Sequence, residues 1–505
     1  MKLLSVLFVA YCMLGVSFQY VSADSRSTNC LIVIDAAAVN SAGALSELEA
    51  SVERHGCSIR HVFWPWALFA YAPEGVGSLM EKDSLITAVV RSGLSPSQAS
   101  GFGLPSWVVS SWNAIVTGKE QRPSVEKVAA AGPIGIASRA NDRPPIMEDF
   151  SMLEGSVEDF FTSSYLIGRV AVGIFLMESE GSSSTEDWSS ADENSAISGV
   201  ARALNILAER ADEENARVSW YYDIHKGVPT SYEPISTTGV PFFDWWGCRC
   251  VRYWWLDDAM SAAGHHEGGL VGIYSYLNSV RRSFQADWAH ILFLAKSELD
   301  ADHAFEMSDG GLALGYAPWF PIIELDWPPV GPEELGSLFA VVGYPGVALE
   351  DPLDFVGTVI HETVHVFGGA EEGYDCVCGL DDDCVNYLRE PNPNCILCNQ
   401  NPVPCVMLQD GLHRLCPSTR AQLGWRHLYD SDGVPDAIDP NTNKVIVPLD
   451  NTPPGSIVKI WVAEQGEMAL VKSYACTPDN TTYSDGHYKS IWDCISNWGN
   501  PSLPT

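Results

Sequence analysis

The segment EDPLDFVGTVIHETVHVFGG, residues 350–369, constrains the fold more than any other part of the chain. Asp351 before Pro352 is typical of a helix N-terminus, and Gly368 with Gly369 is typical of a helix end. One face of this helix is apolar and has to pack against a core; it carries Leu353, Val356, Ile360, Val364 and Phe367. The sequence therefore predicts a buried helix that starts at Pro352 and ends before Gly368.

The two histidines of this helix lie on one side of it. His361 and His365 are four residues apart, so both imidazoles project from the same face. Two neutral imidazoles one turn apart can bind zinc. Glu362 lies about 100° further around the helix. It cannot easily ligate the same ion, but it can reach a water on an open zinc position, as a general base does. The alternative is a pair of structural histidines on a buried helix face.

Oxygen ligands follow directly after the helix. Gly368 permits the sharp turn that a third ligand close in sequence requires, and Glu371 and Glu372 lie just beyond it. Met407 lies farther downstream, after a cysteine-rich insert at 376–405. Chance matches to HExxH alone occur. The glycine, the acidic pair and the methionine together favour a zinc site.

This HExxHxxGxxE pattern with a downstream methionine resembles the metzincin clan of zinc peptidases. The resemblance implies a zincin-like catalytic domain in which His361, His365 and Glu371 hold Zn²⁺. It also implies that Met407 is the methionine-turn residue, which forms an apolar floor below the histidines.

The third zinc ligand has two candidates. Metzincins usually place His or Asp where this chain has Glu371, and the resemblance favours that residue. Secreted zincins similar to the immune inhibitor A and IgA-protease types carry an acidic pair followed by tyrosine, which Glu371, Glu372 and Tyr374 resemble. In that parallel the ligand is Glu372. Tyr374 is a candidate for stabilising the developing oxyanion.

The resemblance implies a secreted zinc-dependent endopeptidase that acts on protein or peptide substrates. Zinc would polarise the scissile carbonyl, while Glu362 takes a proton from the attacking water and passes it to the leaving amine. The sequence leaves two other interpretations open. One is an extracellular binding or adhesion protein with a structural or inactive zinc site. The other is a zinc hydrolase of a non-peptide amide.

The N-terminus is typical of a secreted protein. Residues 1–23 combine Lys2, an apolar stretch and small residues before Ala23, which predicts a signal peptide and an extracellular chain. No later segment is long and apolar enough to span a membrane. Cys12 lies in the signal, and secretion favours disulfides among the other thirteen of the fourteen cysteines. A formal charge of −35 argues against a nucleic-acid partner.

The chain has 505 residues, too many for one compact core, and its patterns predict an α+β protein of several domains. Residues 24–95 show the order β-α-β-β-α-β of a split βαβ plait, which resembles the propeptides of secreted proteases. The alternative is a structural or substrate-binding domain. Residues 96–160 are predicted to be a linker. Residues 161–429 are predicted to form the catalytic domain, with a mixed twisted sheet and the active-site helix.

Two cysteines within 24–95 bear on the propeptide hypothesis. They are Cys30 and Cys57. A free thiolate from this segment could occupy the fourth zinc position. The favoured alternative is that the two cysteines bridge each other and that the plait blocks the cleft without ligating zinc.

The C-terminal segment 430–505 contains an aspartate-rich loop and a small β-rich module. Oxygen ligands at alternating positions around a glycine suit Ca²⁺; the candidates are Asp430, Asp432, Asp436 and Asp439. The alternative is a polar linker. The aromatic-rich segment 241–258 is expected to be a disulfide-stapled part of the core, or else an exposed platform for sugar or peptide.

Overall fold

The structure is a computed structural model of the whole chain. The residues that it describes are 28–38, 42–117, 162–163, 165–179, 187–230, 240–243, 249–252, 254–266, 269–296, 322–325, 339–344, 352–373, 392–408, 412–425, 438–439, 444–445, 457–464 and 467–475. The predicted signal peptide, residues 1–23, lies outside these ranges. Among the described residues, no helix combines the length and the apolar character needed to cross a membrane.

Eight strands form one mixed sheet. The first five strands in spatial order run parallel to their neighbours, and the remaining pairs are antiparallel. The spatial order is β11 (Phe339–Tyr344), β9 (Trp288–Lys296), β5 (Gly168–Ser179), β6 (Val218–Thr230), β2 (Ser58–Phe63), β3 (Ala67–Ala72), β1 (Thr28–Ile34) and β4 (Ile86–Val90). β9 and β11 are buried along almost their whole length, as expected of parallel strands with helices on both faces. The sequence predicts an α+β protein with a mixed twisted sheet, and the structure contains such a mixed sheet together with helices.

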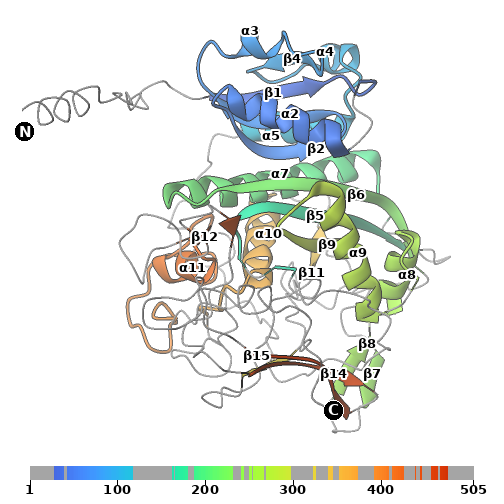
Figure 1. Ribbon diagram of the computed structural model, residues 1–505, viewed down its shortest axis with the longest axis vertical. Helices are drawn as coiled ribbons and strands as arrows, with labels where there is room; N and C mark the ends of the chain where they lie inside the picture. Colours follow the sequence, from blue (N-terminus) through green and yellow to red (C-terminus); the bar gives the residue numbers. More distant parts are fainter. Residues whose placement is uncertain are drawn as a thin grey trace, which may run out of the picture.

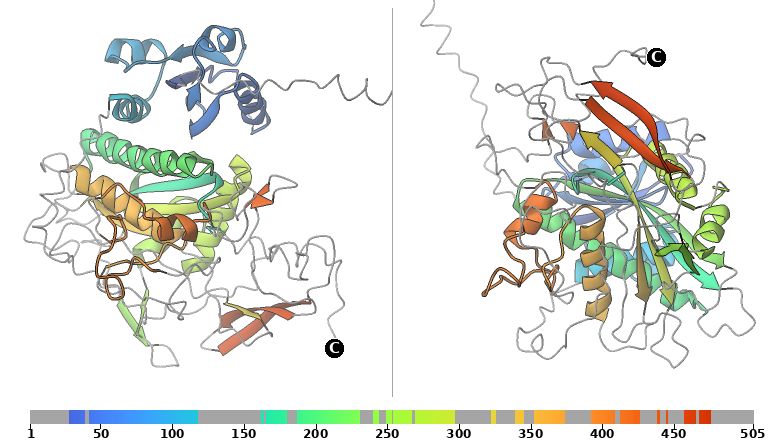
Figure 2. Two further views of the ribbon diagram at one scale, coloured as in Figure 1. Left: turned by 90° about the vertical axis from the view of Figure 1, so that its left-hand side faces the viewer. Right: turned by 90° about the horizontal axis from the view of Figure 1, so that it is seen from below.

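Helices cover both faces of the parallel part of this sheet (Figures 1 and 2). On one face lie α7 (Ser190–Glu213) and α10 (Pro352–Val366), which pack against each other. On the other face lie α8 (Trp254–Ala262) and α9 (Gly269–Phe284). Glycines permit two of these contacts. A Cβ atom at Gly173 of β5 would meet the Tyr276 hydroxyl of α9, and one at Gly199 of α7 would meet the Phe355 ring of α10.

The order predicted for the N-terminal segment is present. β1, α2 (Ala42–Arg54), β2, β3, α3 (Gly77–Met80) and β4 follow one another in the chain. In the sheet they give the order β2-β3-β1-β4, in which β3 lies between the parallel strands β1 and β2. Gly56, where α2 is followed by β2, has a φ of +76°, a conformation that favours glycine.

Part of the predicted linker, 96–160, is wrong. Residues 96–117 form two helices, α4 (Pro96–Gly101) and α5 (Ser106–Thr117), and α5 packs against α7. Trp107 and Trp112 bury their indole rings in the core. Ser95 caps α4 through a capping box with Gln98. Serine and proline here mark helix starts rather than an extended linker.

The N-terminal strands belong to the same sheet as the rest of the chain. β2 pairs in parallel with β6, His61 opposite Trp220. Buried polar contacts reinforce this junction. Arg60 donates a hydrogen bond to the carbonyl of Ala208 at 3.0 Å, and His61 Nδ1 lies 2.8 Å from the hydroxyl of Tyr222. Release of residues 24–95 would uncover a strand edge and a buried polar junction, which favours the structural alternative over a removable propeptide.

Cys30 and Cys57, expected to bridge each other, are free buried thiols. Burial and then the neighbouring Cys57 raise the pKa of Cys30 to about 12. The Cys57 sulfur lies 3.7 Å from the sulfur of Met80. Neither thiol is suited to ligate a metal as a thiolate, because burial favours the neutral form of each.

Smaller sheets complete the described part of the chain. β10 (Ile322–Leu325) pairs with β14 (Ile457–Glu464), which pairs with β15 (Glu467–Ala475). A strand from the predicted catalytic segment thus joins the C-terminal module. β12 (Ile438–Asp439) pairs with β13 (Lys444–Val445), and the aromatic-rich segment forms a hairpin of β7 (Val240–Phe243) and β8 (Arg249–Arg252) that precedes α8.

The junction between the N-terminal strands and the rest of the sheet predicts one cooperative unit. Phe63 is fully buried and stacks on Tyr222 with ring centroids 4.4 Å apart. Phe63→Ala should lower the free energy of unfolding by about 3–5 kcal/mol. Leu79→Ala, at a side chain that is 50% exposed on α3, is the matched control and should change it by less than about 1 kcal/mol. Separate unfolding of residues 28–117, with the rest unaffected in a denaturant titration, would contradict this expectation.

His290 of β9 predicts a loss of stability in acid. It is fully buried against the rings of Trp220 and Phe367, and neither ring nitrogen has a hydrogen-bond partner among the described residues. Burial lowers its pKa from 6.5 to about 3. Between these values the unfolded chain binds a proton that the folded chain does not, so stability falls as the pH falls.

The substitution His290→Phe should remove this part of the pH dependence, about 1.4 kcal/mol per pH unit. It should also leave the protein at least as stable at pH 8, because no unsatisfied ring N–H stays buried. Urea titrations at pH 8, 6 and 4.5 measure both effects. An unchanged slope in the variant would show that His290 is not held neutral.

Candidate metal centre

Helix α10 brings the imidazole rings of His361 and His365 close together. The helix spans Pro352–Val366, as the sequence predicts. The Nε2 atoms of His361 and His365 lie 2.9 Å apart. The His361 side chain is only 1% exposed, whereas that of His365 is 23% exposed. The pair therefore has one side in the core and one side toward solvent.

Backbone carbonyls fix the orientation of both rings. His361 Nδ1 lies 2.9 Å from the Val406 carbonyl, and His365 Nδ1 lies 2.8 Å from the Gly369 carbonyl. A carbonyl can only accept, so each Nδ1 carries the hydrogen in the neutral ring and each Nε2 presents a lone pair. Two lone pairs then face each other, which is the arrangement of two histidines that share a metal ion.

Glu371 adds a carboxylate oxygen to the same point. Gly368 ends the helix with a φ of +85°, which favours glycine. The chain then turns back so that Glu371 Oε2 lies 3.4 Å from His361 Nε2 and 3.5 Å from His365 Nε2. The other oxygen, Oε1, accepts a hydrogen bond from the Gly373 N–H at 2.7 Å, which holds Oε2 toward the histidines.

The electrostatics of Glu371 follow from this position. Burial raises its pKa, but hydrogen bonds and positive charge from the adjacent histidine rings, when these carry a proton on Nε2, outweigh burial and hold the pKa well below the usual range for a glutamate. The carboxylate is therefore ionised. The three ligand atoms of His361, His365 and Glu371 all lie within 4.8 Å of one another.

Glu362 lies beside this group without belonging to it. Its Oε1 is 3.7 Å from His361 Nε2, and its side chain is largely buried. This placement agrees with the helical geometry expected for a base next to the ligands. Tyr374 lies outside the described residues, as do Asp430, Asp432 and Asp436; of Asp439 only the backbone, in β12, is described. The oxyanion and calcium hypotheses therefore stay predictions.

Met407, the candidate methionine-turn residue, lies in a turn that contacts the candidate site. Residues 406–408 form a turn. The Val406 carbonyl accepts from His361, and the Met407 carbonyl accepts from the N–H of Glu372 at 2.9 Å. Met407 is fully buried. The turn thus touches both the first histidine and the residue after Glu371.

Glu372 faces away from the histidines into a second, fully buried group. Its Oε1 accepts from the Thr419 hydroxyl at 2.9 Å and from the Cys416 thiol at 2.7 Å. Its Oε2 accepts from the Asn394 amide at 2.6 Å. Burial and then the neighbouring Cys416 raise the pKa of Glu372 to about 8. Of the two candidate third ligands, the structure brings Glu371 to the histidines and places Glu372 elsewhere.

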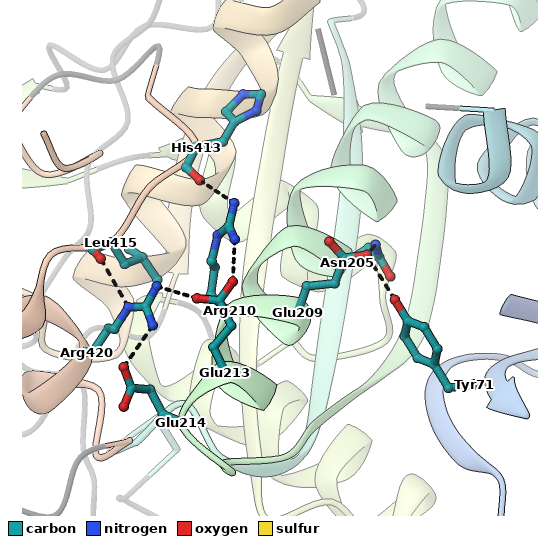
Figure 3. A network of polar contacts seen from close by, with 9 residues as sticks. All are labelled: Tyr71, Asn205, Glu209, Arg210, Glu213, Glu214, His413, Leu415 and Arg420. Carbon is teal, nitrogen blue, oxygen red and sulfur yellow. Dashed lines mark hydrogen bonds and ion pairs between the residues drawn. The ribbon is translucent and has the colours of Figure 1, made fainter. Parts of the chain in front are cut away.

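These partners of Glu372 were missed from the sequence. Thr419 belongs to α11 (Pro417–Gln422), and Cys416 is its N-cap residue. α11 is fastened to the end of α7: Arg420 donates to Glu213 at 2.7 Å and to Glu214 at 2.8 Å (Figure 3). The only local signal for this segment is a cysteine before Pro417, which is typical of a helix start.

Substitution of the two candidate ligands should have different effects. Glu371→Ala should lower the affinity for zinc at least 10-fold, because it removes one of three ligand atoms. Glu372→Ala should retain zinc better but melt at a lower temperature, because it leaves Asn394 and Thr419 without their buried acceptor. Zinc competition with a chromophoric chelator and thermal melts measure both. A larger loss of zinc in Glu372→Ala than in Glu371→Ala would exchange the two assignments.

Comparison with known proteins does not assign the chain to a family. No family model matches the chain. No curated protein sequence matches it either. The function of this centre therefore has to follow from the geometry and chemistry of its own residues.

Proposed function

We propose that this protein is a secreted zinc-dependent endopeptidase whose metal is held by His361, His365 and Glu371. The observation that supports it most directly is the convergence of two imidazole lone pairs and one ionised carboxylate oxygen within 4.8 Å. Without a cation these groups repel one another. The Glu371 Oε2 atom is buried, and the Nε2 atoms of His361 and His365 lie 3.4 and 3.5 Å from it.

The donor set favours zinc among the common metals. Two imidazole nitrogens and one carboxylate oxygen are a frequent ligand set of catalytic zinc, which keeps a fourth position for substrate or water. Calcium and magnesium prefer all-oxygen sites. The partial exposure of His365 leaves one side of the group open to solvent, as a catalytic site requires and a closed structural site does not.

The residues around the metal position have separate roles in the proposed hydrolysis. Zinc supplies Lewis-acid chemistry, which polarises a carbonyl and makes a proton of water easier to remove. Glu362, whose Oε1 lies 3.7 Å from a ligand nitrogen, takes that proton and passes it to the leaving amine. The carbonyls of Val406 and Gly369 keep the ligand rings oriented through their Nδ1–H groups.

The base assignment predicts the behaviour of Glu362→Gln. This change keeps shape and removes only the ability to accept a proton, so turnover of a casein or peptide-library substrate should fall by roughly 10²–10⁴-fold. Bound zinc, measured by elemental analysis, should be unchanged. Glu193→Gln, the same chemical change at the start of α7 and far from the centre in sequence, is the matched control and should keep full activity.

Two outcomes would contradict the proposal in different ways. Full activity in Glu362→Gln would exclude this base. Stoichiometric zinc with no hydrolysis of any peptide by the wild-type protein would instead leave a metal-binding protein that is not a peptidase. Cleavage of a non-peptide amide would show that the substrate is not a peptide, while the proposed mechanism would still apply.

A further inference from the structure

Two buried thiols lie side by side next to the candidate metal centre. Cys405 is 0% exposed and Cys416 is 2% exposed. The backbone N–H of Cys416 donates to the sulfur of Cys405 at 3.3 Å, and each sulfur lies 3.3 Å from the hydroxyl of Thr419. The two sulfur atoms are within 4.8 Å of each other. Neither is bonded to another cysteine.

The backbone holds these thiols together independently of any bond between them. The N–H of Val406 donates to the Arg414 carbonyl at 2.7 Å, so the segment just after Cys405 and the segment just before Cys416 lie side by side. The chain between the two cysteines contains Met407 and the Val406 carbonyl that orients His361. A covalent link at this point would close the loop that supports the first zinc ligand.

We propose that Cys405 and Cys416 form a disulfide in the mature protein and that this bond fastens the methionine-turn loop to the start of α11. The bond forms by thiol–disulfide exchange with a disulfide oxidant of the glutathione class. The oxidant's S–S bond breaks and takes up two electrons and two protons as two thiols, while one S–S bond forms between Cys405 and Cys416. Because both thiols are buried, the exchange takes place as the chain folds, before the loop closes.

The surrounding groups favour a disulfide over a second metal site. Glu372 would be the third ligand of such a site, but both of its oxygens already accept hydrogen bonds, from Thr419, Cys416 and Asn394. This differs from Glu371, whose Oε2 receives no hydrogen bond among the described residues. The donors around Glu372 already compensate the burial of its oxygens without a cation, whereas the two neighbouring thiols can still be oxidised to a disulfide.

One substitution separates the bond from the helix cap. The Cys416 sulfur accepts from the Thr419 N–H at 3.4 Å as the N-cap of α11. Serine is among the best N-cap residues. Cys416→Ser therefore keeps the cap and removes the disulfide, and Cys405→Ser removes the same bond from the other side.

The full chain should be refolded with reduced and oxidised glutathione, alkylated without reduction, digested and mapped by mass spectrometry. We expect a linked peptide that joins Cys405 to Cys416 and that disappears after reduction. Cys30 and Cys57 are the internal control, since they are also free and buried in the structure. Recovery of Cys405 and Cys416 as alkylated free thiols, or linkage of either one to another cysteine, would overturn the proposal.

A second measurement does not depend on peptidase activity. Cys416→Ser and Cys405→Ser should each lower the thermal midpoint of the oxidised protein by roughly 5 °C, and the double variant by no more than either single one, because all three lack the same bond. Additive shifts would overturn the proposal. So would a sulfur-to-cadmium charge-transfer band in the unreduced protein that Cys416→Ser abolishes, since it would show a thiol metal site instead.

Discussion

The hydrogen bond between His361 and the Val406 carbonyl is the contact on which the candidate centre depends. α10 by itself sets only the spacing of the two histidines. The ring of His361 turns its Nε2 toward His365 because its Nδ1–H is held at 2.9 Å by a carbonyl from a segment 45 residues away in sequence. If that carbonyl moved, the lone pair of His361 would lose its direction, and the three candidate ligand atoms would no longer converge on one point.

The Val406 carbonyl is in turn held by a series of buried contacts. The methionine turn accepts from the backbone of Glu372, and the side chain of Glu372 is bound by residues of α11. Arg420 of α11 reaches the acidic end of α7, where it pairs with two glutamates. One turn before these glutamates, α7 also contacts the N-terminal strands, through the hydrogen bond from Tyr71 to Glu209. Figure 3 shows both sets of contacts on one helix.

This arrangement favours a structural role for the N-terminal segment over that of a removable propeptide. Its strands extend the sheet through β6, and its helix α5 packs on α7, the helix that anchors α11. A segment joined in this way contributes to the stability of the elements that support the candidate metal ligands. A removable inhibitor would instead be expected to contact the rest of the chain through exposed and separable surfaces.

Local sequence determined much of this protein. The capping residues and apolar spacing predicted α10 from Pro352, and alternation with turn residues predicted β-α-β-β-α-β over the first described segment, because these features depend on neighbours within one turn or one hairpin. The same local view failed at 96–117, where Trp107 and Trp112 form part of the core. A serine- and proline-rich composition indicates an exposed segment only if no part of the chain that is distant in sequence packs over it.

Only the tertiary structure decided which glutamate faces the histidines, that β2 pairs with β6, and that Cys405 meets Cys416. Glu371 and Glu372 are chemically identical neighbours, and their spacing from Gly368 differs by a single residue. What distinguishes them is a pair of buried hydrogen-bond donors, Asn394 and Thr419, that binds the second carboxylate and leaves the first for the candidate metal position. Those partners come from segments brought together by packing over long sequence separations, and no local pattern encodes such a meeting.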